Sequence, residues 1–414
     1  MPSFSIPLSG LDASSTGLST IANNLANLNT VGFKEQTVEF QDLFYQQIGT
    51  SGDGNPVQVG VGTSVAGINS DLTQGSVQTT GVPTDVAIQG DGFLIATNNG
   101  ETLYTRAGDL TIAANGQLQT QDGAAVMGYP AVNGVINANA TLSPLFIATG
   151  TTNPPKATAN AQLTLNLDSG TAVGGTFSTS LVAYDSLGAS HVLTFTFTKT
   201  AANTWSYNVT IPAADVTGAA APVSVANGNL TFNGNGQLVP PPAAGTPIAV
   251  NMTNLADGAN NLTFNWNIYD ANNAGLLTQV AGPSATSATQ QDGYSSGSLV
   301  NFTIGSDGTI QGVFSNGQTN PLGQIALATF ANEQGLIRNG SNEFLSSLAS
   351  GAPNVGAPGT GGRGTLSGGA LEQSNVDIAT EFAQLIVTER SYQANAKSIT
   401  TFDEVTQTAI NLVQ

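Results

Sequence analysis

The sequence predicts an α+β fold in which coiled-coil-like helical segments at the two ends of the chain flank nested, mainly antiparallel β domains. Near each end, apolar residues recur every three or four positions, which is the period of an α-helix. Between the ends, Asp-Gly and Asn-Gly pairs separate short stretches in which apolar and polar residues alternate, as they do in β-hairpins. With 414 residues, the chain is long enough for two or three domains with a sizeable core.

The N-terminal segment predicts one helix with a narrow apolar seam. The seam residues follow one another at steps of seven, three, four and three, and they are Leu11, Leu18, Ile21, Leu25 and Leu28. Pro7 is tolerated in a first helical turn, and Gly32 is expected to end the helix.

The C-terminal segment predicts a second, longer helix. Ser374 followed by Asp377 resembles a capping box at its start, and neither Gly nor Pro occurs from Ser374 to Gln414. Such a helix would be roughly 50 Å long. Its near-heptad apolar positions are Ile378, Phe382, Leu385, Tyr392, Ala396, Ile399 and Ile410. The two seams predict either a two-helix coiled coil within one molecule or packing of both helices against neighbouring copies.

The middle of the chain predicts β-structure. Leu193, Phe195 and Phe197 alternate with threonines, and a second alternating run that begins at Trp205 follows after a short connection, so a hairpin is expected. A third alternating run begins at Leu262.

Stretches rich in Gly and Pro suggest where the domains begin and end. If the terminal helices meet, each domain except the central one combines an early and a late segment. The expected division is a terminal helical core domain (1–33 and 370–414), extended linker segments (34–75 and 351–369), a discontinuous inner β domain (76–148 and 290–350) and an inserted outer β domain (149–289).

The composition excludes several classes of function. The net charge is −18, from 26 acidic and 8 scattered basic residues, so no basic face is available for nucleic acid. Charged residues make up only 8 % of the chain, against about a quarter in an average soluble domain. A surface of neutral polar groups is typical of extracellular bacterial appendages. The absence of cysteine excludes disulfides and thiolate metal sites.

The chain shows no sign of membrane insertion or of a cleaved signal. No apolar run reaches the roughly 18 residues that a bilayer-spanning helix needs. The first residues, Met1 to Pro7, lack both a basic region and an apolar region, so a cleaved secretory signal is not expected.

Nothing in the sequence predicts an active site. His191 is the only histidine, and although a Ser–His–Asp triad with Asp185 is formally conceivable, no nucleophile elbow accompanies it. The glycines from Gly359 to Gly364 lack the Lys-Ser/Thr that a phosphate-binding loop requires. We therefore expect no catalytic, cofactor-binding or metal-binding residues and no enzymatic activity.

Two segments resemble the signatures of the flagellar rod and hook axial proteins. The N-terminal one runs from Ala22 to Lys34, and the C-terminal one runs from Ser367 to Asp377 and continues from Arg390 to Lys397. Gly90–Phe93 and Tyr104–Gly108 are similar to the β domain that this family shares. The motif residues carried by these segments are Asn23, Asn24, Asn27, Gly32, Phe33, Asn375, Asp377, Gln393 and Asn395. The sequence departs from the family pattern only slightly, at Thr388-Glu389-Arg390 and at Gly369.

The resemblance implies a structural subunit of the extracellular flagellar hook. Such subunits polymerise into a bendable helical tube that transmits motor torque from rod to filament, and the large central β insert favours hook over rod. The implied partners are other copies of the chain, distal rod and hook-filament junction proteins, the hook cap and the type III export apparatus. Export without signal-peptide cleavage is implied as well. The alternatives are a distal rod protein of the same family and, more remotely, a secreted β-rich adhesin or surface-layer protein.

Overall fold

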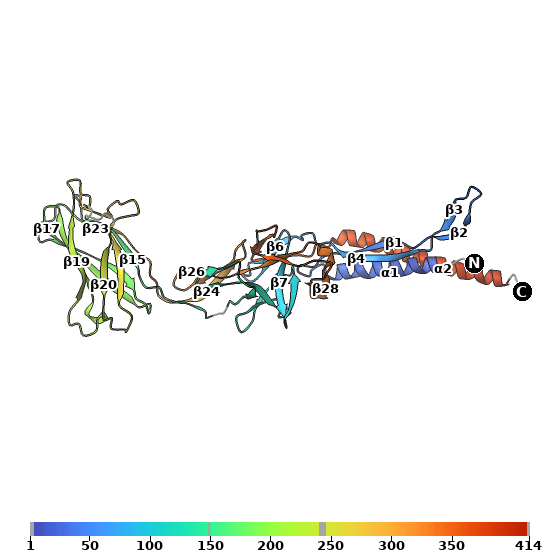
Figure 1. Cartoon of the computed structure of the whole chain (residues 1–414), viewed down its shortest axis with the longest axis horizontal. Helices are drawn as coiled ribbons and strands as arrows, with labels where there is room; N and C mark the ends of the chain where they lie inside the picture. The colour runs from blue at the N-terminus through green and yellow to red at the C-terminus, as the bar shows by residue number, and fades with distance from the viewer. Residues whose placement is uncertain (1–3, 148–149, 240–245, 412–414) are drawn as a thin grey trace. The chain divides into compact units, whose positions relative to one another are not determined.

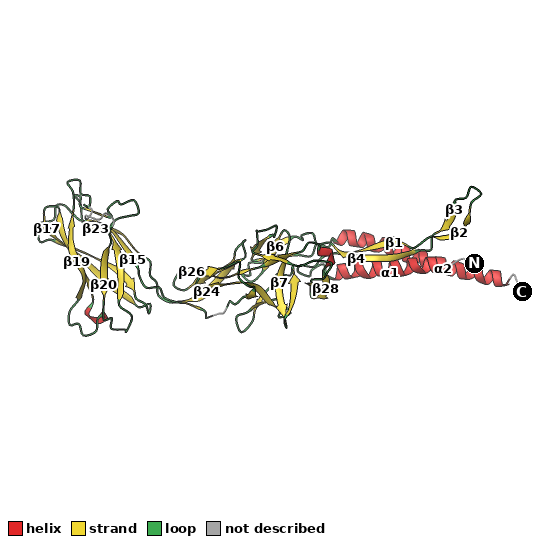
Figure 2. Ribbon diagram, viewed as in Figure 1, coloured by secondary structure: helices red, strands yellow, loops and turns green. Residues whose placement is uncertain are grey.

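A computed structural model describes residues 4–147, 150–239 and 246–411 of the chain (Figure 1). The chain forms two compact units. The first consists of Met1–Thr149, Asn301–Gly312 and Thr319–Gln414, and the second consists of Gly150–Val300 and Val313–Gln318. The α-helices described belong to the first unit, and strands dominate the rest of the chain (Figure 2). The predicted α+β fold class is confirmed, with the second unit inserted within the sequence of the first.

Two helices, α1 (Ser5–Ala26) and α2 (Ile378–Asn411), lie side by side in the first unit (Figure 1). Segments from the early and late parts of the sequence therefore meet as a helix pair. None of the helices in the described ranges is long and apolar enough to cross a membrane.

Small side chains let α1 and α2 approach closely. A Cβ added to Gly10 would lie 2.8 Å from Asn395 Nδ2, and one added to Gly17 would lie 3.2 Å from Thr388 Cγ2. The contact position moves forward along α1 as it moves backward along α2, so the helices are antiparallel. On each helix the contacts are seven residues apart, which is the repeat of a coiled-coil seam.

The helix α1 ends six residues before the glycine that was expected to end it. It stops at Ala26, where the N–H of Asn27 still donates to the carbonyl of Asn23, and the chain then turns. Gly32 has a φ of +67° and lies in the turn that leads to the first strand, against the backbone of Ala107. The prediction of a helix stop at Gly32 was therefore wrong, because Gly32 serves a close backbone approach.

The start of α2 is capped by Asp377 rather than by Ser374. Asp377 Oδ1 accepts hydrogen bonds from the N–H groups of Ala379 and Thr380 at 2.8 and 2.9 Å. These bonds from Thr380 and Ala379 lower the pKa of the Asp377 carboxyl. Ser374 Oγ accepts only from the N–H of Val376, so the predicted capping box is wrong in its register.

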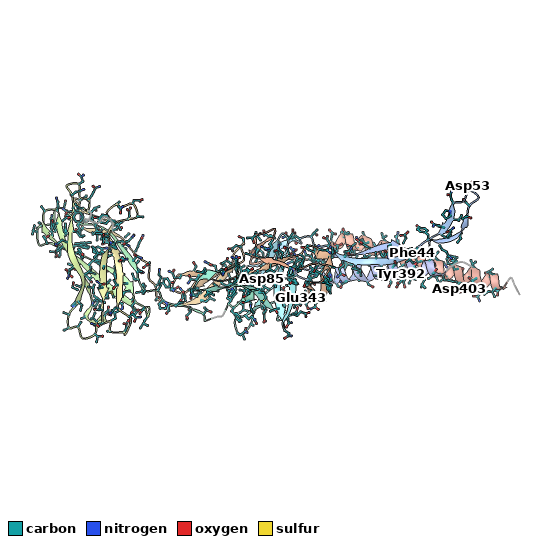
Figure 3. The ribbon with its side chains drawn as sticks, in the orientation of Figure 1. Phe44, Asp53, Asp85, Glu343, Tyr392 and Asp403 are labelled. Carbon is teal, nitrogen blue, oxygen red and sulfur yellow. The ribbon has the colours of Figure 1, made fainter. Side chains whose placement is uncertain are left out.

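Two antiparallel hairpins follow α1 where a linker was expected. The strand β1 (Gln36–Asp42) pairs with β4 (Thr63–Ser70), and between them β2 (Gln46–Thr50) pairs with β3 (Pro56–Val59). Every residue of β2 and β3 is exposed. Phe44, which lies between β1 and β2, is 94 % exposed (Figure 3).

The β part of the first unit joins early and late strands. Antiparallel pairs link β5 (Val77–Thr79) with β32 (Ala370–Glu372), β6 (Val86–Gln89) with β31 (Thr365–Gly368), β8 (Glu101–Thr105) with β29 (Glu343–Leu345), β11 (Ala125–Val132) with β26 (Thr319–Ile325), and β7 (Phe93–Asn98) with β27 (Leu327–Thr329). Shorter strands complete it: β9 (Thr111–Ile112), β10 (Leu118–Gln119), β12 (Val135–Ile136), β13 (Ser143–Pro144), β28 (Ile337–Gly340) and β30 (Asn354–Gly356). Aromatic rings of Phe93, Tyr104, Phe330 and Phe344 pack edge to face in its core.

The second unit is built from two sheets that share one core. The first sheet has the order β16 (Thr176–Tyr184), β17 (Ser190–Ala201), β18 (Thr204–Ile211) and β19 (Val223–Thr231), all antiparallel. The second has the order β20 (Ile248–Met252), β21 (Leu262–Asn267), β15 (Asn160–Asn166) and β22 (Leu277–Thr278), with β23 (Ala285–Gln291) also on β15. The short strand β14 (Thr152–Asn153) and the 3₁₀ turn η1 (Ala213–Asp215) also belong to this unit, and β24 (Gly297–Ile304) and β25 (Thr309–Phe314) contain residues of both units.

The core of the second unit explains the alternating sequence. Leu193, Phe195 and Phe197 are fully buried on β17, and the expected hairpin with β18 is present. The ring of Phe195 on the first sheet contacts that of Trp266 on the second, with centroids 5.0 Å apart. Trp205 is buried in the same cluster, so both tryptophans of the chain report on the second unit.

Candidate functional site

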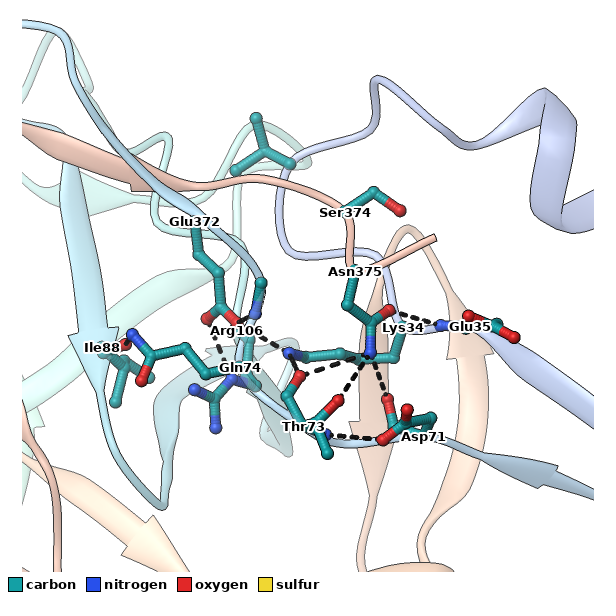
Figure 4. A network of polar contacts seen from close by, with 12 residues as sticks. Lys34, Glu35, Asp71, Thr73, Gln74, Ile88, Arg106, Glu372, Ser374 and Asn375 are labelled. Carbon is teal, nitrogen blue, oxygen red and sulfur yellow. Dashed lines mark hydrogen bonds and ion pairs between the residues drawn. The ribbon is translucent and has the colours of Figure 1, made fainter. Parts of the chain in front are cut away.

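Polar residues from distant parts of the sequence converge where the helix pair meets the β part of the first unit (Figure 4). We call Asn24, Lys34, Arg106, Glu372 and Asn375 the junction network. Two of them, Asn24 and Asn375, were singled out from the sequence, whereas the three charged residues were not.

Glu372, at the end of β32, carries the two ion pairs of the junction network. Its Oε1 lies 2.6 Å from Lys34 Nζ, and its Oε2 lies 3.0 Å from Arg106 Nε. Oε1 also accepts from the N–H of Gly75 at 2.9 Å. All three charged side chains are at most 4 % exposed. Burial lowers the pKa of the Lys34 ammonium, while the bond to Glu372 opposes that shift. Such a buried group of charges is stable only because each charge has its partners.

Lys34 and Arg106 also donate hydrogen bonds to backbone carbonyl oxygens. Arg106 donates to the carbonyl oxygens of Gly92 at 3.2 Å and Gly90 at 3.0 Å, and Lys34 donates to that of Thr73. Arg106 and Lys34 share Glu372 as a partner, so the segments around Gly90 and Arg106 are connected through Glu372 to the chain that follows α1. The carbonyl of Glu372 also accepts from the N–H of Gly32 at 2.8 Å.

The two asparagines fix the chain between α1 and β1. Asn24 Oδ1 accepts from the N–H of Gln36 at 3.0 Å, and its Nδ2 donates to the carbonyl of Gln36 and to Glu381 Oε1, both at 2.9 Å. Asn375 Oδ1 accepts from the N–H of Glu35 at 2.8 Å, and its Nδ2 donates to the carbonyl of Asp71. Because each amide supplies both a donor and an acceptor, an isosteric acid could not make these pairs.

Glu381 and Glu35 form a pair of neighbouring carboxyl groups beside Asn24. Glu381 is 1 % exposed, and its Oε2 has no hydrogen-bond partner in the described part of the chain. Burial raises the pKa of the Glu35 carboxyl, and the charge of Glu381 raises it further. A proton held by Glu35 would give Glu381 the donor that it lacks.

We expect the stability of the first unit to fall as pH rises because of Glu35. A carboxyl whose pKa is higher in the folded than in the unfolded state binds more protons when folded, so its contribution is present at low pH and lost as pH rises through the folded-state pKa. Glu35→Gln should therefore stabilise the protein at pH 7 by about 0.5 kcal/mol, the usual size of a partly exposed charge pair. The measurement is thermal unfolding by circular dichroism at 222 nm between pH 4 and 8. Glu39→Gln, at an exposed position of β1, is the matched control, and an equal gain in both variants would contradict the expectation.

The other motif residues lie around the junction network or on the helices. Phe33 is 4 % exposed, and Asn27 Nδ2 donates to the carbonyl of Asn23 at 2.9 Å. Asn395 faces Gly10 of α1, whereas Gln393 is exposed and bonds only Glu389 on its own helix.

The predicted seam residues do not form one closed seam within the chain. On α1, Ile21 is buried, and Leu11, Leu18 and Leu25 are half-buried. Leu28 is half-buried as well, but it lies beyond the end of α1. On α2, Leu385, Tyr392 and Ile399 are half-buried, and Ile378, Phe382 and Ile410 are exposed. The most buried face of α1 consists of small or polar residues: Ala13, Ser14, Gly17, Thr20 and Asn24. Asn24 was singled out from the sequence, and the other four were not. The seven-residue spacing of Gly10, Gly17 and Asn24 was the signal that could have revealed this face.

An apolar stripe on α2 is left exposed. Ile378, Phe382 and Ile386 lie four residues apart, on one side of the helix, and are 49, 50 and 51 % exposed. We call these three residues the α2 stripe. Glu381 faces α1, and one residue further along a helix turns the side chain by about 100°, so the α2 stripe lies beside the face that contacts α1.

Known proteins match nearly the whole chain. Four family models match it: "Flagella basal body rod protein" over residues 6–34, "Flagellar hook protein FlgE/F/G D1 domain" over 87–159, "Flagellar basal body protein FlaE D2 domain" over 167–294, and "Flagellar basal body rod FlgEFG protein C-terminal" over 367–412. The flagellar hook protein FlgE of Salmonella typhimurium is 38 % identical over 426 residues, covering 99 % of this chain and 100 % of that protein. The chain belongs to the flagellar hook protein family. Its function is that of a structural subunit of the flagellar hook.

Other hook proteins agree with this assignment. FlgE of Escherichia coli is 36 % identical and covers 99 % of both chains, and FlgE of Treponema pallidum is 34 % identical and covers 98 % of both. The crystal structure of Helicobacter pylori flagellar hook protein FlgE2 matches with a TM-score of 0.52 and 15 % identity, over 72 % of this chain and 100 % of that chain. That likeness is one of fold alone. Full-length matches to hook proteins support the hook over the rod and adhesin alternatives.

Proposed function

We propose that this hook subunit polymerises through its helix pair, with the α2 stripe and the half-buried seam residues as the contact surface between copies. The observation that carries the proposal is the exposure of three large apolar side chains, Ile378, Phe382 and Ile386, side by side on one helix. A contact between different surfaces of successive copies generates an open helical polymer. Each large apolar side chain that becomes buried contributes about 1.5–3 kcal/mol to such a contact.

The junction network gives the helix pair a fixed attachment to the β part of its own unit. Buried ion pairs and paired asparagines hold α1, α2, β32 and the segment before β5 together, which suits a subunit that must carry load. The second unit presents neutral polar side chains, and contacts of that kind can shift as a tube bends. We assign no enzymatic activity to either unit.

The proposed functional division is that of the sequence: a helical core (1–33 and 370–414), connecting segments (34–75 and 351–369), an inner β domain (76–148 and 290–350) and an outer β domain (149–289). Rod, junction, cap and export proteins of the flagellum are the proposed partners. The proposed location is the extracellular hook, reached without removal of a signal peptide.

Phe382→Ser tests the contact surface. Because Phe382 is half-exposed in the single chain, its loss should leave the monomer folded but weaken the polymer by about 2 kcal/mol, which raises the critical concentration for assembly more than roughly tenfold. Sedimentation over a range of protein concentrations measures the critical concentration, and electron microscopy shows whether tubes form. Val173→Ser, which removes an apolar side chain with 68 % exposure from the second unit, is the control. An unchanged critical concentration in Phe382→Ser would exclude the α2 stripe from the contact.

A further inference from the structure

Four polar side chains from distant parts of the sequence meet at one end of the second unit. Asp185 lies in the turn after β16, and His191 lies on β17. Asp215 belongs to η1, and Asp257 lies in the loop between β20 and β21. We call these four residues the His191 cluster. The sequence alone predicted no metal site here, because the chain has no cysteine and no second histidine.

The distances in the His191 cluster suit a bound cation. His191 Nε2 lies 3.1 Å from Asp185 Oδ2 and 3.9 Å from Asp257 Oδ2. One ligand atom from each of Asp185, His191 and Asp257 lies within 4.8 Å of the other two. Zn²⁺ binds nitrogen and carboxylate oxygen at about 2.0–2.2 Å, so a cation can reach all three atoms after small side-chain movements.

The surroundings hold Asp185 and His191 in place. Asp185 is fully buried, and its Oδ1 accepts from the N–H groups of Leu187 and Ala189 at 2.8 and 2.9 Å, which leaves Oδ2 facing the ring. The other ring nitrogen, His191 Nδ1, lies 3.2 Å from Asp215 Oδ2. Metal-bound histidines usually make this contact, because a carboxylate on the second nitrogen fixes the ring and its tautomer. Burial would raise the pKa of the Asp185 carboxyl, but contacts with Asp257, His191 and the two N–H groups outweigh burial and lower it.

The His191 cluster carries more negative than positive charge, so a bound cation would be attracted to it. Three carboxylates surround one imidazole, and the Lys and Arg ion pairs found among the described residues involve other acids, Glu372 and Asp292. A carboxylate only accepts hydrogen bonds, and a neutral imidazole donates from one nitrogen. If Nδ1 donates to Asp215, then Nε2 directs a lone pair at the space between Asp185 and Asp257.

We propose that His191, Asp185 and Asp257 bind a divalent transition-metal cation of the zinc class, with Asp215 as a positioning residue. One imidazole with carboxylates favours such a cation over Ca²⁺ and Mg²⁺, which prefer oxygen ligands alone. His191 lies on a strand of the first sheet and Asp185 lies in the turn between two strands of that sheet, whereas Asp257 follows a strand of the second sheet. The cation therefore links the two sheets at this end.

The test uses the full-length chain and its tryptophans. Trp205 and Trp266 both lie in the core of the second unit, so thermal unfolding followed by tryptophan fluorescence reports on that unit. Addition of Zn²⁺ should raise its Tm by about 3 °C or more, and Mg²⁺ or Ca²⁺ at the same concentration should raise it far less. Co²⁺, as a spectroscopic probe, should show visible absorption bands of a cation bound by nitrogen and oxygen.

Variants separate the His191 cluster from other acids of this chain. His191→Gln and Asp257→Asn should each lose the Zn²⁺-induced shift, measured against the Tm of the same variant without metal. If His191→Gln folds poorly, Asp257→Asn still tests the proposal, because the Asp257 side chain is 30 % exposed and its substitution disturbs the core less. Asp53→Asn removes the same charge from the exposed hairpin of β2 and β3 and should keep the full shift. The proposal is overturned if Zn²⁺ produces no shift, if both variants keep it, or if Ca²⁺ produces an equal one.

Discussion

Glu372→Gln is expected to lower the unfolding free energy of the first unit by about 3–5 kcal/mol, the usual cost of removing one partner from a buried ion pair. The substitution leaves two cations, Lys34 and Arg106, in a site where they are at most 4 % exposed. Their other partners are neutral carbonyl oxygens, which cannot replace the charge of the carboxylate. The amide nitrogen of Gln would also direct a donor at one of the two cations.

Two signals from one sample separate this effect from a general loss of fold. Urea unfolding followed by circular dichroism at 222 nm reports on α1 and α2 in the first unit, and tryptophan fluorescence reports on the second. Only the first transition should move. Glu101→Gln, at an exposed position of β8, is the matched control and should leave both transitions in place.

A fully apolar replacement tests the reason for the loss. Lys34→Met, Arg106→Leu and Glu372→Leu together remove all three charges, and the triple variant should recover part of the stability lost in Glu372→Gln. If the triple variant were as unstable as the single one, packing or backbone contacts rather than unpaired charge would explain the cost.

Local sequence patterns predicted the elements whose residues interact with close neighbours. The alternation around Phe195 predicted the β17–β18 hairpin because strand burial repeats every two residues. Asn-Gly pairs predicted turns because they tolerate positive φ, and Asn99 and Gly100, with φ of +51° and +87°, link β7 to β8 in this way. The long run without Gly or Pro predicted α2 for an equally local reason.

The contacts of the junction network could not be predicted from local sequence patterns. Lys34 and Glu372 are 338 positions apart, and nothing near either residue indicates its partner. The rarity of charge was the available clue, because a buried cation needs a partner and this chain has only eight basic residues. The pattern of apolar residues does not reveal the contact face of α1, because Gly17 packs through its small size and Asn24 through hydrogen bonds of its side chain.

Gly32→Ala is expected to lower the unfolding free energy of the first unit by about 2–5 kcal/mol. Gly32 has a φ of +67°, a conformation that costs a residue with a Cβ about 1–2 kcal/mol. A Cβ there would also lie 2.7 Å from the backbone nitrogen of Ala107 and 2.8 Å from the carbonyl carbon of Arg106. Backbone cannot rotate away as a side chain can, so overpacking should add about 1–3 kcal/mol. Urea unfolding followed by circular dichroism at 222 nm measures the loss of unfolding free energy. The turn at Gly32 lies against Arg106, which is hydrogen-bonded to Glu372 of the junction network.

Gly81→Ala separates the two causes of that loss. Gly81 has a similar φ of +73°, but a Cβ added there would meet nothing within 4 Å. Its substitution should therefore show the conformational cost alone, about 1–2 kcal/mol, and the difference between the two variants measures the close approach at the junction network. Equal losses in Gly32→Ala and Gly81→Ala would mean that the backbone of Arg106 and Ala107 yields freely. In that case, glycine in the N-terminal signature would be required for its φ angle and not for the contact between the turn after α1 and the β part of the unit.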